Sequence, residues 1–138
     1  MCGRYTLTID RNAISVVYDA QWSSPEAAAS WKPRFNIAPE SRLPIIVSDS
    51  GRRVIRSMKW GLVPHWAKDE ASAARSINAR AETVADKPTF RTAFRQHRAL
   101  VPADSFFEWD AGRTPHRIVG PGGAPYAFAA VWDAWRAP

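Results

Sequence analysis

The sequence has little of the chemistry that stabilises small secreted or metal-binding domains. Its 138 residues include one cysteine, Cys2, and three histidines, His65, His97 and His116. One cysteine cannot form an intramolecular disulfide, and this scarcity is typical of proteins of a reducing cytoplasm. These four side chains also lack the spacing of metal ligands. We therefore predict no disulfide scaffold, no zinc site and no cofactor.

Long apolar runs are also missing. No stretch approaches the roughly 18 apolar residues of a membrane-spanning helix, and the N-terminus lacks the apolar segment of a signal peptide. We expect no membrane contact, and a bacterial cytoplasm is the default location. Hydrophobic residues make up 46% of the chain and charged residues 23%, which is typical of a folded protein. The length predicts one domain over residues 1–138.

Acidic residues are outnumbered, and lysine is rare. The net charge is +6, and 15 arginines stand against 4 lysines. The planar arginine guanidinium binds phosphate oxygens and stacks on bases. Seven tryptophans add stacking surfaces, and basic charge combined with aromatics is typical of single-strand nucleic-acid binders. The alternative is a basic surface without a ligand, with the tryptophans in the core.

Local patterns predict short strands interspersed with short helices. Helices are expected over residues 10–20, with Asp10 as N-cap, and over 87–98. Strands are expected over 43–49 and 52–60, joined by a turn at Asp49-Ser50-Gly51. Later strand-like runs are 99–110, broken by a kink, 116–119 and 126–132. Together they predict an α+β domain with a mixed or antiparallel sheet.

The chain stops directly after its last strand-like run. Natural domains usually cover or pair an edge strand. The ending therefore predicts either a truncation at the C-terminus or an edge that pairs with another molecule.

The position of Cys2 has chemical consequences if Met1 is removed, as a small second residue permits. Cys2 would then carry an α-amine, with a pKa of about 7.7–8.0, next to a thiol with a pKa of about 8.5. Such a group condenses with an aldehyde to an imine, and the neighbouring thiol can close a thiazolidine ring. In a basic, aromatic protein, the matching aldehyde is the opened sugar of an abasic site in single-stranded DNA. From this residue alone, an incidental cysteine, a lipidation site and an amide-attacking nucleophile remain open.

Five segments together resemble one known family. They are MCGRYTL (1–7), PRFNIAP (33–39), WGLVPHW (60–66), INARAET (77–83) and LVPADSFFEW (100–109). The set resembles the SOS-response-associated peptidase (SRAP) family, the abasic-site processing proteins, in order along nearly the whole chain. The resemblance implies a single SRAP-like domain of the α+β class.

The resemblance implies three catalytic residues. Cys2 matches the nucleophile that forms a thiazolidine cross-link to the abasic site after Met1 is lost. Asn78 matches an active-site asparagine, whose amide can orient the cysteine or the opened sugar. Glu108 matches an active-site glutamate that exchanges protons while the imine forms or breaks down. A structural asparagine in a turn and a surface carboxylate on a strand are the alternatives for the last two.

The resemblance also implies DNA contacts. Arg4 and Arg80 match arginines that hold phosphates, and Trp66 lies in the loop that places an aromatic wedge against the bases. Pro39 matches a position at the DNA channel, and Lys87 one directed toward a phosphate. Solvated or ion-paired arginines and a core tryptophan are the alternatives.

The sequence departs from the family pattern at its C-terminus. Family members continue into a segment whose histidine assists proton transfer, and this chain ends before it. We expect cross-linking to survive without that histidine, and reversal or strand-cleaving elimination to be weakened. Ser105 and Phe107 replace the usual Gly and Tyr, which are mild changes.

The resulting prediction is a DNA-damage (SOS) response protein of the bacterial cytoplasm, associated with the nucleoid during repair. It binds an abasic site in single-stranded DNA, or at a junction of single and double strands, and cross-links through Cys2. Autopeptidase (hydrolase) activity removes Met1, and lyase activity depends on the missing histidine. No obligate protein partner is expected. The alternatives are a thiol peptidase of N-terminal-nucleophile type and a truncated, non-catalytic single-stranded DNA-binding protein.

Overall fold

Two β-sheets and three short helices make up the part of the chain that the structure, a computed structural model, describes: residues 3–71 and 76–137. The elements are β1 (Arg4–Leu7), α1 (Arg11–Tyr18), β2 (Gln21–Trp22), α2 (Pro25–Ser30), β3 (Arg34–Ile37), β4 (Arg42–Asp49), β5 (Arg52–Lys59), α3 (Arg91–Gln96), β6 (Arg98–Ala103), β7 (Ser105–Trp109), β8 (Pro115–Val119) and β9 (Tyr126–Val131), with a short 3-10 turn, η2 (Pro121–Gly123), between the last two strands. The α+β prediction is confirmed.

Two of the three helices begin at a capping side chain, Asp10 for α1 and Ser24 for α2. Asp10 caps α1 by accepting hydrogen bonds of 2.8 Å from the N–H groups of Asn12 and Ala13, as predicted. The predicted helix over 87–98 is shorter, because α3 begins only at Arg91. Pro88 disfavours helical backbone at the residue before it, and Phe90 at the N-cap provides no capping hydrogen bond.

The five-stranded sheet has the order β2-β5-β4-β6-β9. Its β4–β5 hairpin is the predicted one: Ser50 and Gly51 adopt φ angles of 51° and 80°, the left-handed region that tight hairpin turns require. All pairs are antiparallel except β2 with β5, so the sheet is mixed. The two-residue strand β2 was not predicted.

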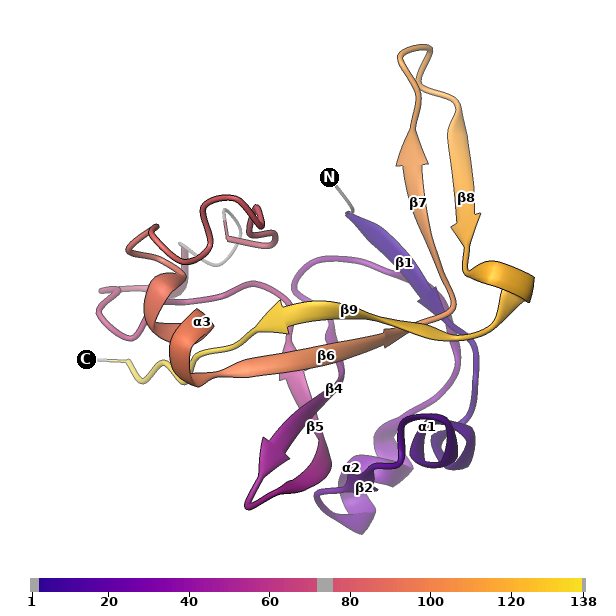
Figure 1. Ribbon diagram of the computed structural model, residues 1–138, viewed down its shortest axis with the longest axis horizontal. Coiled ribbons are helices and arrows are strands. Elements are labelled where there is room, and N and C mark those ends of the chain that lie inside the picture. Colours follow the sequence, from indigo (N-terminus) through magenta and orange to yellow (C-terminus); the bar gives the residue numbers. More distant parts are fainter. Residues whose placement is uncertain (1–2, 72–75, 138) are drawn as a thin grey trace.

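The four-stranded sheet has the order β3-β1-β7-β8. The chain passes from the large sheet to this one at Asp104, between β6 and β7. The β7–β8 hairpin projects away from the rest of the molecule (Figure 1), and every residue of β8 is exposed. The predicted runs 116–119 and 126–132 correspond to β8 and β9, one at the edge of each sheet, and run 99–110 forms β6 and β7.

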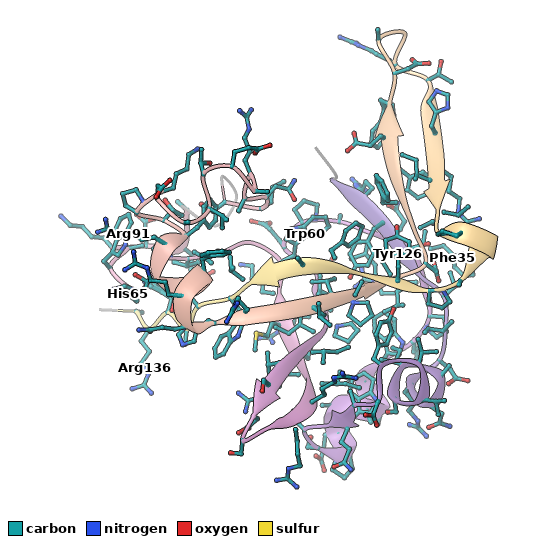
Figure 2. The ribbon with its side chains drawn as sticks, in the orientation of Figure 1. Phe35, Trp60, His65, Arg91, Tyr126 and Arg136 are labelled. Carbon is teal, nitrogen blue, oxygen red and sulfur yellow. The ribbon has the colours of Figure 1, made fainter. Side chains whose placement is uncertain are left out.

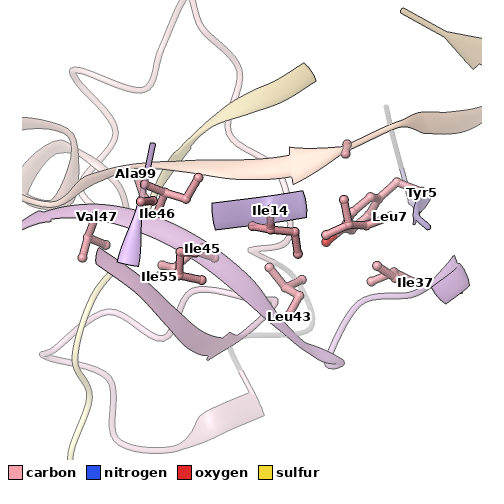
Figure 3. Packing of buried hydrophobic residues seen from close by; sticks show 12 residues of the cluster. Tyr5, Leu7, Ile14, Ile37, Leu43, Ile45, Ile46, Val47, Ile55 and Ala99 are labelled. Carbon is pink, nitrogen blue, oxygen red and sulfur yellow. The ribbon is translucent and has the colours of Figure 1, made fainter. Parts of the chain in front are cut away.

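The core lies between α1 and both sheets. Leu7, Ile14, Ile37 and Ile55 are fully buried, and they come from β1, α1, β3 and β5. Figure 3 shows these side chains in one cluster with the apolar residues of β4. None of the helices in the described residues is long and apolar enough to cross a bilayer.

Candidate functional site

The small sheet joins the N-terminal strand to the strand that carries Glu108. β1 pairs with β7 in antiparallel register, with Arg4 opposite Phe107 and Thr6 opposite Ser105. Continued by one residue, this register brings Gly3 opposite Glu108. Cys2, the predicted nucleophile, lies outside the described residues, but Gly3 is its covalent neighbour. The strand pairing therefore brings the chain next to Cys2 toward a carboxylate 106 positions away in the sequence.

A buried carboxylate fixes this register. Asp104, only 7% exposed, accepts hydrogen bonds from the hydroxyl of Thr6 and from the N–H and hydroxyl of Thr8. The Ser105 Oγ lies 2.5 Å from the Thr6 hydroxyl and accepts a 2.8 Å bond from Arg117 Nε of β8. The network thus links three neighbouring strands of the small sheet.

The charge state of Asp104 follows from the same contacts. Burial raises the pKa of this carboxyl, but the hydrogen bonds from Thr6 and Thr8, together with the positive charge of Arg117, outweigh it. The net pKa lies below its ordinary value, so the network contains a carboxylate at neutral pH. Sequence reasoning did not single out Asp104, although it lies inside the LVPADSFFEW segment.

The tip of the β7–β8 hairpin holds a second carboxylate. His116 lies opposite Glu108 across the two strands, and its Nε2 is 3.0 Å from an oxygen of Asp110. This hydrogen bond has the largest effect on the Asp110 carboxyl, and one from the N–H of Thr114 has the next largest. Together they hold the pKa of Asp110 below its ordinary value. His116 had no predicted role.

On the other side of β1, Arg4 contacts β3. Its Nη1 donates a 3.0 Å hydrogen bond to Asn36 Oδ1, while the arginine as a whole is exposed. Arg4 therefore lies exposed at the N-terminal end of β1. This position is compatible with the predicted phosphate contact.

Trp60 connects the segments that carry Pro39 and Asn78, and sequence reasoning missed this role. Its backbone N–H donates to the Ser41 carbonyl, and its own carbonyl accepts from the Glu40 N–H, both at 2.9 Å. Its indole N–H donates to the Ile77 carbonyl at 2.8 Å.

The ring of Trp60 also contacts β1. It meets the Tyr5 ring edge-on, with centroids 5.7 Å apart, and Figure 2 shows it near the middle of the molecule. Because Pro39 and Asn78 are direct neighbours of Glu40 and Ile77, the backbone and side chain of Trp60 together relate two predicted site segments to the strand of Arg4. The first tryptophan of the WGLVPHW segment was the sequence signal that could have indicated this role.

Three further predicted residues lie in neighbouring segments. Trp66 is 59% exposed, and Arg80 and Lys87 are exposed at the two ends of a turn-rich stretch. Val84 of that stretch packs against a small apolar cluster of Leu62, Phe90 and Ala93. Leu62 belongs to the same loop as Trp66, so the cluster keeps the loop beside the turn-rich stretch that carries Arg80 and Lys87. Trp66 is therefore not a core side chain.

Asn78 and Glu108 are both half-buried. In residues 3–71 and 76–137, no group of three or more His, Cys, Asp or Glu side chains could hold a metal ion. Arg4 and Glu108 lie on one strand pair, and Trp60 links this pair to the segment of Asn78, whereas Trp66, Arg80 and Lys87 lie on other segments. Such a set can bind phosphate and a base and can move protons.

Comparison with known proteins identifies the family to which this fold belongs. The family model described as SOS response associated peptidase (SRAP) matches residues 1–138, and the chain belongs to this family. The predicted membership is confirmed.

Individual relatives include the "Abasic site processing protein YoqW" of Bacillus subtilis (strain 168), which is 36% identical over 142 residues, covering 100% of this chain and 62% of the relative. YoaM of the same organism is 37% identical over 98% of this chain and 60% of its own length. The mouse "Abasic site processing protein HMCES" is 29% identical, over 99% of this chain and 49% of its own length. The chain thus spans about half to three-fifths of these relatives.

Solved structures share the fold. A crystal structure of a protein from Bacteroides thetaiotaomicron superimposes with a TM-score of 0.85 at 25% identity, covering 99% of this chain and 62% of that one. A protein from Bordetella bronchiseptica gives a TM-score of 0.79 at 26% identity, with 99% and 65% covered.

Proposed function

We propose that this chain acts in the DNA-damage response by binding abasic sites in single-stranded DNA, or at single/double-strand junctions, and cross-linking to them through Cys2. The observation that carries the proposal is the β1–β7 register, in which Arg4 lies opposite Phe107, so one further step along the two strands leads toward Cys2 on one and to Glu108 on the other. Relatives named abasic site processing proteins support the choice of substrate. The charge of +6 supports a nucleic-acid partner.

The proposed reaction begins with hydrolysis of the Met1–Cys2 peptide bond, which frees the α-amine. The amine nitrogen attacks the sugar aldehyde, and the resulting adduct loses water to form an imine. The Cys2 sulfur then attacks the imine carbon, and the thiol proton goes to the nitrogen, which closes a thiazolidine ring. Glu108 delivers and accepts protons at the carbonyl oxygen and the nitrogen. A lyase reaction would start from the imine before ring closure.

The remaining site residues would hold the substrate. Arg4, Arg80 and Lys87 bind phosphates as exposed cations. Asn78 orients the opened sugar through its amide. Trp66 stacks on a base beside the lesion. Pro39, near Trp60, borders the bound DNA strand.

An oligonucleotide with a single abasic site tests the proposal. Wild-type protein should give an adduct that survives a denaturing gel, and its mass should show the loss of Met1 and of one water. A tetrahydrofuran site of the same length, which has no aldehyde, is the matched substrate control.

Two variants resolve the chemistry. Cys2→Ala keeps an amine but has no thiol, so its adduct should appear only after borohydride reduction of the imine. Cys2→Ser should behave similarly, because a hydroxyl is a much weaker nucleophile than a thiol at neutral pH. Stable adducts of Cys2→Ala without reductant would overturn the proposal.

Other outcomes point to other functions. Equal, salt-sensitive binding to intact and abasic strands without any adduct would indicate a non-catalytic single-strand binder. Turnover of a peptide substrate without DNA would indicate a thiol peptidase.

A further inference from the structure

The segment after β9 forms hydrogen bonds with both sequence neighbours of Trp66. Oδ2 of Asp133 accepts a 3.2 Å bond from the His65 N–H and lies 3.4 Å from His65 Nδ1. The indole N–H of Trp135 donates a 2.7 Å bond to the Ala67 carbonyl. The backbone of Trp66 is therefore held on each side, while its ring stays 59% exposed.

The segment that makes these contacts is itself anchored. The Trp132 N–H donates to the His97 carbonyl at 2.9 Å, and the two rings stack with centroids 4.4 Å apart. The Asp133 side chain is only 10% exposed, and its Oδ1 accepts a bond from the Ala134 N–H. Figure 2 shows His65 and Arg136 at the same end of the molecule.

The loop of Trp66 is also fixed at its start and in its middle. The Leu62 N–H donates to the Ser76 carbonyl at 3.1 Å, and the Ala67 N–H closes a turn onto the Pro64 carbonyl at 2.8 Å. An exposed aromatic side chain on a flexible loop would lose conformational freedom when it stacks on a ligand. A loop held at several points has already lost much of that freedom on folding.

We infer that Asp133 and Trp135 are positioning residues, which hold Trp66 in the orientation that stacks on a base of single-stranded DNA. This inference rests on the proposed role of Trp66. Neither residue needs to touch DNA, because each acts through the backbone beside the indole. Loss of either should weaken binding only as far as Trp66 contributes to it.

A double-mutant cycle with the full chain tests this inference. The readout is the Kd for an intact, fluorescently labelled single-stranded oligonucleotide, measured by anisotropy at fixed salt, so it does not depend on cross-linking. Trp66→Ala should weaken binding by about tenfold, within the range measured for base–aromatic stacking. Asp133→Ala should weaken it by about threefold to tenfold in the wild-type background, and by less than about twofold in the Trp66→Ala background.

Three further variants separate positioning from charge and folding. Asp133→Asn removes the same charge but retains an acceptor oxygen, so its loss should be smaller than that of Asp133→Ala. Trp135→Phe should mimic Asp133→Ala. Asp49→Ala is the matched control, because it removes a carboxylate paired with Arg56 on another strand pair and should not weaken binding. Circular dichroism checks that each variant is folded.

Equal losses from Asp133→Ala in both backgrounds would overturn the inference, and so would a Trp66→Ala variant that binds as wild type does. If the protein failed to cross-link to an abasic site but the effects of Asp133→Ala and Trp66→Ala on the Kd were still non-additive, only the proposed function would be contradicted.

Discussion

The two sheets are stabilised in different ways. In the five-stranded sheet, β4 has five consecutive buried residues from Leu43 to Val47, and they pack into the apolar core. In the four-stranded sheet, β8 has no buried residue, and the contacts between β1, β7 and β8 include the buried polar network around Asp104. The strands that carry Arg4 and Glu108 therefore combine a buried polar network with the apolar contacts of Tyr5 and Leu7, whereas the buried residues of β4 are all apolar.

This difference matters for the proposed site because polar networks specify register. A slip of one residue between two strands turns every side chain to the opposite face. Such a slip would separate Gly3 from Glu108. An apolar contact tolerates small shifts, whereas Asp104 accepts from Thr6 and Thr8 at defined positions. We expect the small sheet to be less stable but more precisely aligned than the large one.

The largest expected effect is a cavity in the large sheet. Ile55→Ala removes a fully buried side chain of β5 and should lower the free energy of unfolding by about 2–5 kcal/mol. Urea unfolding followed by circular dichroism measures it. Since no titratable group is involved, the loss should be equal at pH 7 and at about pH 3. Val16→Ala, at an 81% exposed position, is the control. A comparable loss of unfolding free energy there would contradict the view that apolar burial stabilises the large sheet.

A smaller and pH-dependent effect is expected in the small sheet. Asp104→Asn should lower the free energy of unfolding by about 1–3 kcal/mol at pH 7, because an amide cannot accept all the bonds of the carboxylate. The folded-state pKa of Asp104 is lowered, so its stabilisation is complete above the unfolded value of about 3.9 and is lost as the pH falls through the folded value.

The difference between wild type and Asp104→Asn should therefore narrow below about pH 4. Asp49→Asn, whose carboxylate pairs with Arg56 at a partly exposed site, should change stability by less than about 1 kcal/mol. A pH-independent loss for Asp104→Asn would show that the charge of the carboxylate does not stabilise the small sheet.

The smallest effect on stability is expected at Arg4. Arg4→Gln should change the free energy of unfolding by less than about 0.5 kcal/mol, while reducing the salt dependence of single-stranded DNA binding by about one phosphate contact. Fluorescence anisotropy across a salt series measures the slope. Arg52→Gln, at the exposed first residue of β5, should leave the slope unchanged. If the salt dependence of DNA binding were the same for Arg4→Gln, Arg52→Gln and wild type, Arg4 would not contact a phosphate.

Local features of the fold were predictable from the sequence. Asp10 at the start of α1 and Ser50-Gly51 in the β4–β5 turn act through residues next to them, so their patterns are complete within a few positions. The motif segments likewise indicated the family and the predicted site residues. The pairing of β1 with β3 and β7 was not predictable, because no local pattern specifies a strand's distant partner.

The sequence by itself therefore determined the basic charge, the α+β class, the family and the residue types available for chemistry. Only the tertiary structure decided which of them meet. Thr6 bonds to Asp104 across 98 positions, and His65 bonds to Asp133 across 68. Trp60 likewise relates the segments of Pro39 and Asn78 to β1. Contacts at such separations follow from how the two sheets pack, and packing is a property of the whole chain that no single segment contains.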